Sequence, residues 1–259
     1  MLCLDVVQII CDFSDLKTQI NLIQSCKEYD EYLKIRKLDC SCLIRFKIGC
    51  EITQEIIQQK KFNKLQKLNA DGNNKITNIN HLRNTLTELN CGWGCKIDQK
   101  GISDLLKLQK LNATDNSRIT DVNHLRNTLT ELYCYWDCGI DQKGISNLKV
   151  LQKLNASSNS NITDVNHLQN TLIELDCWHG GIDQKGISNL KVLQKLNAYC
   201  NSKITDVNHL QNTLNELDCG CYCGIDQKGI SDLKVLQKIN ADNNNKITDV
   251  NVCLSKKMK

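Results

Sequence analysis

The chain has 259 residues, and 41% of them are hydrophobic, which provides enough apolar surface for a substantial core. Its formal net charge of +4 is spread out except for the tail Lys256-Lys257-Met258-Lys259, and a nucleic-acid-binding protein usually carries a dense basic stripe instead. No apolar run approaches the roughly 18 residues that span a bilayer. The N-terminus lacks the basic start of a signal peptide. We therefore expect an intracellular, cytoplasmic protein that binds neither nucleic acid nor membrane, with its 16 cysteines reduced.

The first forty residues have apolar residues at helical spacing. Val6, Val7 and Ile10 fall on one face, and Ile20 and Ile23 fall on another. This spacing predicts short helices over 4–13, 16–25 and 27–36. We expect an all-helical head over residues 1–42.

The head resembles the F-box, a motif that runs from Leu-Pro and an acidic residue through an apolar helix to apolar-Cys-Lys-x-Trp. Leu2 and Cys3 take the place of Leu-Pro, Asp5 that of the acidic residue, and Cys26-Lys27-Glu28-Tyr29 that of the last element, with Tyr29 where Trp is usual. In that family the F-box binds the Skp-type adaptor of a cullin ubiquitin ligase. The resemblance implies an adaptor surface made of Leu2, Val6, Val7, Ile10, Ile20, Cys26 and Tyr29.

A repeat occupies most of the remaining chain. The string LQKLNA starts at Leu65, Leu108, Leu151 and Leu193, and returns as LQKINA at Leu236, so the period is 42 or 43 residues. Between these copies lies the pattern Leu-x-Glu-Leu-x-Cys, starting at Leu86, Leu129, Leu172 and Leu214. Alternating units of 21 and 22 residues are typical of leucine-rich repeats. The sequence therefore predicts an α/β solenoid over residues 65–259, a leucine-rich-repeat horseshoe with a parallel sheet on its concave side.

The segment 43–64 is an imperfect copy of the repeat, as expected of a terminal coil, and we assign it as the N-terminal capping repeat. The residues that fit the pattern there are Leu43, Phe46, Ile48 and Phe62. At the other end, no C-terminal cap is visible in the sequence.

Polar residues recur at fixed places in the repeat and favour structural roles. One asparagine per 43 residues is expected to be buried and to bond the backbone of neighbouring coils. Asp141 is expected to cap a short helix. The recurring histidines are unlike a catalytic constellation. The asparagines are Asn73, Asn116, Asn159, Asn201 and Asn244, and the histidines are His81, His124, His167 and His209.

The cysteines of the second unit align at an inward position of each strand, where a free thiol behaves as a small hydrophobic group. Cys134 aligns with Cys91, Cys177 and Cys219, and Cys138 with Cys95 and Cys223. Equivalent thiols in alternate coils are about twice the roughly 4.8 Å strand spacing apart, too far to converge on one metal ion. We expect no metal, no cofactor and no catalytic residue, and hence no enzyme. A cysteine-based metal or redox protein is a less favoured alternative.

Aromatic residues gather on or just after the strands, at variable, outward positions. Tyr and Trp dominate the hot spots of protein interfaces. We therefore predict that they bind a partner on the concave face; the alternative is that some only shield the sheet. These residues are Trp93, Tyr133, Tyr135, Trp136, Trp178, Tyr199 and Tyr222, and His179 lies beside them.

A charge pattern runs beneath the aromatic residues. One unit type carries Lys and the other carries Glu at the same position, which predicts cross-strand pairs worth about 0.2–1 kcal/mol each. Such pairs neutralise one another and argue against a phosphate-binding surface. The lysines are Lys67, Lys110, Lys153, Lys195 and Lys238, and the glutamates are Glu88, Glu131, Glu174 and Glu216.

The pattern Cys-x-Ile-Asp-x-x-Gly-Ile is similar to the cysteine-containing leucine-rich repeat, and the chain as a whole resembles F-box/leucine-rich-repeat proteins, including those of giant DNA viruses of amoebae. This resemblance implies a receptor that presents an unknown protein substrate, from the host if the protein is viral, to a Skp–cullin ubiquitin ligase. The alternative is an interaction scaffold without a ligase partner, in which the head only caps the solenoid.

Overall fold

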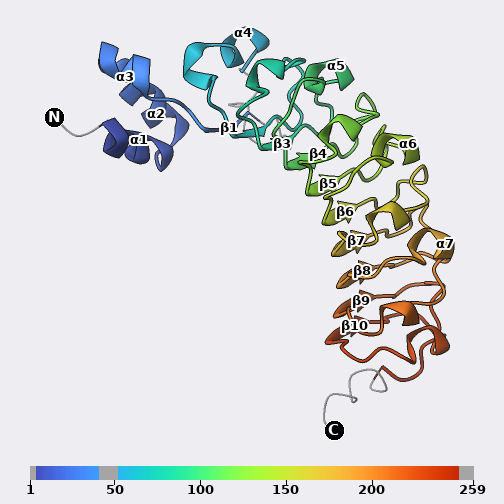
Figure 1. Ribbon diagram of the computed structural model, residues 1–259. Coiled ribbons are helices and arrows are strands. Elements are labelled where there is room, and N and C mark those ends of the chain that lie inside the picture. Colours follow the sequence, from blue (N-terminus) through green and yellow to red (C-terminus); the bar gives the residue numbers. More distant parts are fainter. Residues whose placement is uncertain (1–3, 41–51, 251–259) are drawn as a thin grey trace. The chain divides into compact units, whose positions relative to one another are not determined.

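The computed structural model describes residues 4–40 and 52–250 of the chain (Figure 1). The chain falls into two compact units, 1–112 and 113–259. In the described ranges, no helix combines the length and the apolar character needed to cross a bilayer.

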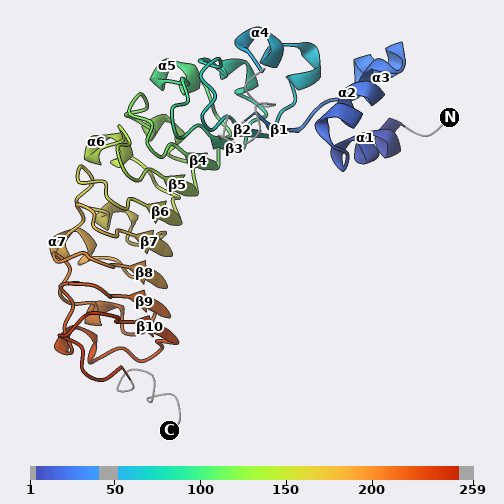
Figure 2. The ribbon, with the colours of Figure 1, turned by 180° about the vertical axis from the view of Figure 1, so that it is seen from behind.

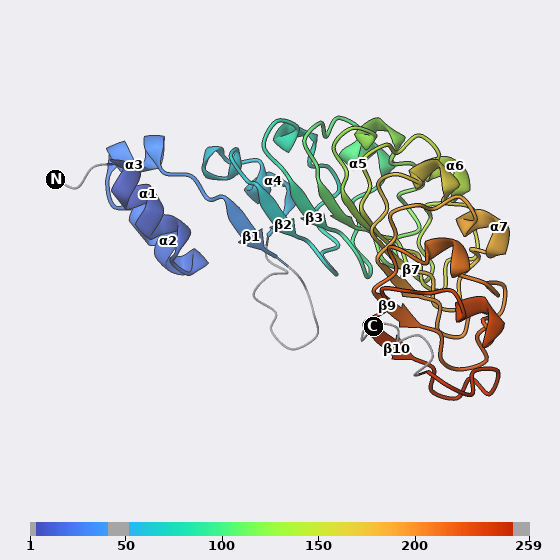
Figure 3. The same ribbon diagram turned by 60° about the horizontal axis from the view of Figure 1, so that its bottom comes forward.

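The first unit begins with three short helices, which lie side by side in Figure 3: α1 (Leu4–Asp12), α2 (Leu16–Gln24) and α3 (Lys27–Tyr32). Asp15 starts α2 by accepting a hydrogen bond from the Thr18 N–H at 2.9 Å. The predicted third helix over 27–36 is too long, because Leu33 has an extended backbone (φ −74°, ψ 139°) that leads the chain into a strand.

That strand, β1 (Lys37–Asp39), pairs in parallel with β2 (Lys67–Asn69) and sets Leu38 against Leu68. The sheet thus begins inside the segment 1–42 that the sequence assigns to the head. Ile35, Leu38 and Cys40 are buried and repeat the Leu-x-x-Leu-x-Cys spacing, with isoleucine in the first place. Of the expected capping repeat 43–64, Leu43, Phe46 and Ile48 lie outside the described residues.

The rest of the first unit alternates strands with short helical returns. Phe62, at the end of a 3₁₀ helix, is fully buried, as its place in the pattern predicts. Strands β1 to β4 are parallel and pair in chain order. The further elements are α4 (Gln54–Ile57), η2 (Lys60–Phe62), η3 (Asn80–Leu82), β3 (Glu88–Asn90), α5 (Gln99–Ile102) and β4 (Lys110–Asn112).

The second unit repeats this alternation. Its strands are also parallel and pair in chain order from β5 to β10, while α6 and α7 lie on the opposite side of the coils, as Figure 2 shows from behind. The predicted leucine-rich-repeat solenoid is therefore confirmed. The elements are η4 (Asn123–Leu125), β5 (Glu131–Tyr133), α6 (Gln142–Ile145), β6 (Lys153–Asn155), η5 (Asn166–Leu168), β7 (Glu174–Asp176), α7 (Gln184–Ile187), β8 (Lys195–Asn197), η6 (Asn208–Leu210), β9 (Glu216–Asp218), η7 (Lys228–Ile230) and β10 (Lys238–Asn240).

The recurring asparagines are buried and bond neighbouring coils, as predicted. Asn159 donates from Nδ2 to the carbonyls of Cys134 at 2.9 Å and Ile140 at 3.0 Å, and its Oδ1 accepts from the Asn161 N–H at 3.0 Å. Asn201 and Asn244 bond the coils before them in the same way. These side chains satisfy backbone groups that the short strands leave open.

On the return side, successive coils approach closely. A Cβ at Gly144 would lie 2.1 Å from the Thr120 carbonyl oxygen, so only glycine fits at this position. Asp141 caps α6 by accepting from the Gly144 N–H, which confirms that prediction. Gln142 then clamps the next coil: its Oε1 accepts from the N–H groups of Thr163 and Asp164, both at 2.9 Å.

Candidate protein-interaction surfaces

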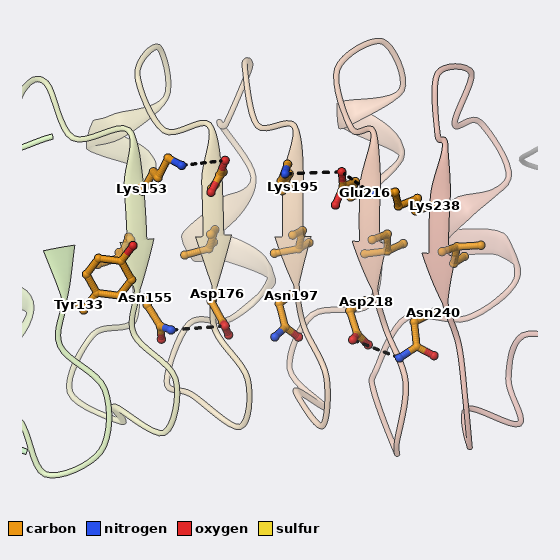
Figure 4. A pocket seen from close by; sticks show the side chains of 16 residues that line it. Tyr133, Lys153, Asn155, Asp176, Lys195, Asn197, Glu216, Asp218, Lys238 and Asn240 are labelled. Atoms are coloured by element: carbon orange, nitrogen blue, oxygen red, sulfur yellow. Dashed lines mark hydrogen bonds and ion pairs between the residues drawn. The ribbon is translucent and has the colours of Figure 1, made fainter. Parts of the chain in front are cut away.

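The solvent-exposed face of the second unit's sheet forms a shallow groove of about 490 Å³ that crosses strands β5 to β10 (Figure 4). Residues of two outward rows line it, and the central residues of the strands form its floor. One row is Lys153, Glu174, Lys195, Glu216 and Lys238, and the other is Tyr133, Asn155, Asp176, Asn197, Asp218 and Asn240.

The charged row consists of cross-strand ion pairs, as predicted. Lys153 lies 3.2 Å from Glu174, and Glu216 sits between Lys195 at 3.5 Å and Lys238 at 3.2 Å. Hydrogen bonding from Lys238, supported by Lys195, holds the pKa of Glu216 below its usual range. Water screens exposed pairs of this kind, so each contributes little to stability. The lysines are thus engaged with carboxylates, which makes the groove a mixed polar surface.

In the second row, the five Asn and Asp residues each end their strand with an Asx turn, in which the side-chain oxygen accepts a backbone N–H two residues on. Asn155 accepts from Ser157 at 3.0 Å, and Asp176 accepts from Trp178 at 3.2 Å. Tyr133 occupies the same position of β5. It makes no Asx turn, and it is the one aromatic residue among the residues that line the groove. The prediction that Tyr133 lies on the strand face is therefore met in position, and its role in binding stays a prediction.

The other predicted aromatic residues of this unit lie beyond the strands. Each strand is three residues long, so the following aromatic positions fall in the turns at its carboxyl end. A hydrogen-bond ladder joins these turns: Trp136 N–H donates to Ser157 O at 3.0 Å, and Ser158 N–H to Trp178 O at 2.7 Å. We call this row the aromatic edge. It comprises Tyr135, Trp136, Trp178, His179, Tyr199 and Tyr222.

The members of the aromatic edge differ in exposure and contacts. Tyr222 is 83% exposed, and Trp136 and Trp178 are also exposed. The rings of Tyr135 and Trp136 meet edge to face, with centroids 5.5 Å apart. Trp93 follows β3 at the matching position of the first unit and is exposed there. The predicted aromatic residues therefore occupy two kinds of position: Tyr133 lines the groove, and the others lie in the turns that follow the strands.

The backbone conformation of these turns was not predicted from the sequence. Trp93, Trp136 and His179 hold φ values of 33°, 59° and 47°, in the left-handed region. A bulky residue is rarely found there because its side chain crowds the backbone. The equivalent turns of the other unit type carry Gly72, Asp115, Ser158, Cys200 and Asn243.

The repeat cysteines lie in the core, as predicted. Cys134, Cys177 and Cys219 are fully buried, and each thiol donates to a carbonyl of the next coil at 3.3–3.5 Å. Burial, followed by the nearby thiol of Cys138, raises the pKa of Cys134 well above its ordinary value. In the described part of the chain, no three potential metal ligands gather into one site.

In the first unit, α1 presents apolar side chains to solvent. Phe13, just past the helix, is 89% exposed, and Val6, Ile9 and Ile10 are each about half exposed. We call these four residues the apolar face of α1. Ile9 and Phe13 were missed from sequence, although their spacing of three and seven residues from Val6 continues the helical pattern.

The residues expected to bind the adaptor have different environments. Val7 is 3% exposed and packs inside the unit, so its side chain does not contribute to the surface. Cys26 is exposed and its sulfur accepts the Tyr29 N–H at 3.5 Å, which starts α3. Ile20 and Tyr29 are half-buried. Leu2 lies outside the described residues.

No protein-family model matches this sequence, and a comparison with curated proteins gave no match. Solved structures share its fold, among them the following three. Rad7, in a complex with Elc1 from yeast, aligns with a TM-score of 0.57 and 15% identity over 96% of this chain and 68% of its own. An internalin from Listeria monocytogenes aligns with a TM-score of 0.52 and 22% identity, over 88% of this chain and 80% of its own. A leucine-rich-repeat protein from Leptospira interrogans aligns with a TM-score of 0.50 and 22% identity, over 98% of this chain and 72% of its own.

Proposed function

We propose that this chain is a non-enzymatic substrate receptor of the F-box/leucine-rich-repeat kind, acting in the cytoplasm. In this proposal, the N-terminal helices bind a Skp-type adaptor of a cullin ubiquitin ligase. The groove and the aromatic edge of the second unit bind the protein to be modified.

The observation that carries the proposal is the apolar face of α1. Single exposed apolar side chains are common, but a contiguous exposed patch of apolar side chains marks an interaction site. Here Val6, Ile9, Ile10 and Phe13 lie at i, i+3, i+4 and i+7, so one helix offers an apolar stripe. This is the geometry of a helix that packs into a partner's groove.

The nature of that partner rests on two further facts. Asp5 and the segment Cys26-Lys27-Glu28-Tyr29 resemble the F-box at matching positions. In addition, the solved Rad7 structure, which shares this fold, contains Rad7 in complex with Elc1. Both facts support an adaptor as the partner of the head.

The substrate surface is supported by the second unit. Its groove presents lysine, carboxylate and amide groups at strand spacing, and the turns that follow its strands present Trp136, Trp178 and Tyr222 to solvent. A polar surface beside exposed aromatic anchors is the composition of a protein-binding site.

The first test is binding of a purified Skp-type adaptor to the full chain, measured by pull-down and calorimetry. The chain is expected to retain the adaptor. The double variant Ile10→Asp, Phe13→Asp is expected to weaken binding at least about tenfold, because two charges would replace apolar anchors. Lys17→Asp, a charge change at an exposed position of α2, is the matched control and is expected to bind like the parent.

Circular dichroism must show the same helix content in all three proteins. Val7 is unsuitable for this test because it is buried, and an aspartate there would unfold the head. Failure of the folded parent to retain any Skp-type adaptor, or equal retention by the double variant, would contradict the ligase proposal.

An interaction scaffold without a ligase partner is the second candidate, and one observation favours it. The head is tied to the first coil, because the Ile35 N–H donates to the Lys61 carbonyl at 2.9 Å and Leu33 and Ile35 are buried. A helical cap needs these contacts and no exposed apolar face. The adaptor experiment therefore separates the two functions.

A further inference from the structure

Two cysteines that are 21 residues apart in sequence lie at the same place in adjacent coils. Strands β8 and β9 pair Lys195 with Glu216, and Cys200 and Cys221 follow these residues by the same interval. The register continues into the turns, because the Cys200 N–H donates to the Gly220 carbonyl at 3.2 Å. Both cysteines take left-handed backbone conformations, with φ of 54° and 44°.

Their side chains are near enough to influence each other's ionisation. After burial, the neighbouring thiol of Cys221 helps to raise the pKa of Cys200, and Trp178 lies near enough to lower it in part. Cys221 also raises the pKa of Tyr199. Both cysteines are partly exposed, unlike Cys219 and Cys223, which are buried in the same coil.

The backbone separation suits a covalent bond. Neighbouring strands lie about 4.8 Å apart. The Cα atoms of a disulfide are usually about 4.4–6.8 Å apart. Residues in register on adjacent coils therefore need no large movement to be joined. Trp136 and Ser158 hold the equivalent places in the coils of β5 and β6, so the facing thiols are a feature of this part of the repeat.

We propose that Cys200 and Cys221 form a reversible disulfide when a peroxide oxidises the protein. In the first step, one thiolate attacks hydrogen peroxide, its sulfur becomes a sulfenic acid and the equivalent of one water leaves. The second thiol then attacks the sulfenic sulfur, the S–S bond forms and a second water leaves. Two thiols thereby lose two electrons and two protons, and one peroxide is reduced to two waters. A dithiol reverses the reaction.

The bond acts on the aromatic edge. It ties the turn that carries Tyr199 and Cys200 to the turn that carries Cys221 and Tyr222, and it converts a thiol whose ionisation Trp178 influences into a disulfide. Oxidation is thus expected to change the surroundings of Trp178, one of three tryptophans in the chain.

Ionisation of the thiols limits the rate. Burial, and then the neighbouring thiol of Cys221, raise the pKa of Cys200 to about 11, so little of its thiolate is present at neutral pH. The thiolate fraction of a group with this pKa rises roughly a hundredfold from pH 7 to pH 9, so disulfide formation is expected to be much faster at pH 9.

The test treats the folded full chain with hydrogen peroxide, blocks the remaining thiols and digests it with trypsin without reduction. Cleavage after Lys195, Lys203 and Lys228 separates the two cysteines into the peptides 196–203 and 204–228. The expected product is the linked pair of these peptides, lighter by two hydrogen atoms and separated again by dithiothreitol. Dilution of the sample must leave its yield unchanged, since the bond is within one chain.

Three variants check the assignment. Cys221→Ser is expected to abolish the link, because the other cysteines of peptide 204–228, Cys219 and Cys223, are buried. Cys26→Ser, at an exposed cysteine elsewhere, is expected to leave it unchanged. Cys200→Ser is expected to retain the parent's circular dichroism and lose the tryptophan fluorescence change on oxidation. Absence of the linked peptides from the oxidised parent, or their persistence in Cys221→Ser, would overturn the proposal.

Discussion

The turn after each of strands β2 to β10 contains a residue in the left-handed conformation, which strains the backbone of any residue other than glycine. Coils with Gly72, Asp115 or Asn243 there use residue types that tolerate this conformation, whereas Trp93 and Trp136 do not. A left-handed conformation costs a residue other than glycine roughly 1–2 kcal/mol. A tryptophan retained at such a cost, with its ring exposed, favours a role outside the fold.

Trp136→Gly tests that role at the level of stability. The variant loses the ring contact with Tyr135, worth about 0.5–1.5 kcal/mol, but it also removes the left-handed strain. We expect the free energy of unfolding to change by less than about 1 kcal/mol in urea titrations, whereas a core tryptophan costs about 3–5 kcal/mol when truncated.

Leu132→Ala is the matched control because Leu132 is fully buried in the strand before Trp136. It should cost about 2–5 kcal/mol. A loss for Trp136→Gly as large as that of the control would mean that the ring is part of the core, and the binding role would be abandoned.

At the scale of the element, the return segments are held by polar side chains. His81, His167 and His209 each direct Nε2 to a carbonyl of the preceding coil at 3.0–3.2 Å, and a carbonyl can only accept, so Nε2 carries the proton. The Gln and Asn residues of neighbouring returns make similar bonds. This explains the recurrence of these histidines without catalysis.

These histidines predict a pH dependence. Partial burial lowers the pKa of all three in the folded protein below the ordinary 6.5, and the bond to the carbonyl offsets this only in part. Their contribution to stability is therefore complete above pH 6.5 and is lost as the pH falls toward the folded-state pKa. The melting temperature is expected to decrease from pH 7.5 to pH 5.5, modestly for each residue because water still reaches the rings.

The triple variant His81→Gln, His167→Gln, His209→Gln keeps a donor at each site and cannot titrate there. Its melting temperature should fall less than that of the parent over the same pH range, as followed by scanning calorimetry. Parallel pH profiles for the two proteins would show that the histidines do not carry the effect.

At this scale, a feature could be predicted from the sequence when its pattern recurs in many coils. The leucine, asparagine and Lys–Glu positions recur many times, so their burial and pairing follow from the sequence. β1 was missed because its coil has Ile35 for the first leucine, and 30 residues rather than 21 or 22 separate Lys37 from Lys67. The position of the aromatic edge, on or just after the strands, was predicted, but its left-handed turns were not, because they arise from backbone bonding that side-chain spacing does not report.

For the whole molecule, stability is a sum over neighbouring coils, and coils with a neighbour on one side are weaker. Ile239, Ala241 and Ile247 of the last described coil remain partly exposed, whereas their equivalents Leu196, Ala198 and Ile204 are buried. The amides of β10 are expected to exchange hydrogen at least about tenfold faster than those of β7. Equal protection in mass-spectrometric exchange would mean that the last coil is covered in solution.

The alternation of lysine and glutamate strands also limits how such a chain can grow. Lys153 faces Glu174, which in turn precedes Lys195 in the sheet, and Asn159 bonds to a cysteine-type coil before it. A single coil inserted there would set two like charges against each other, as Lys37 and Lys67 already are at the pairing of β1 with β2. Copying two coils together keeps both the charge alternation and the asparagine partners, and the near-identical segments of this chain recur at that interval of 42 or 43 residues.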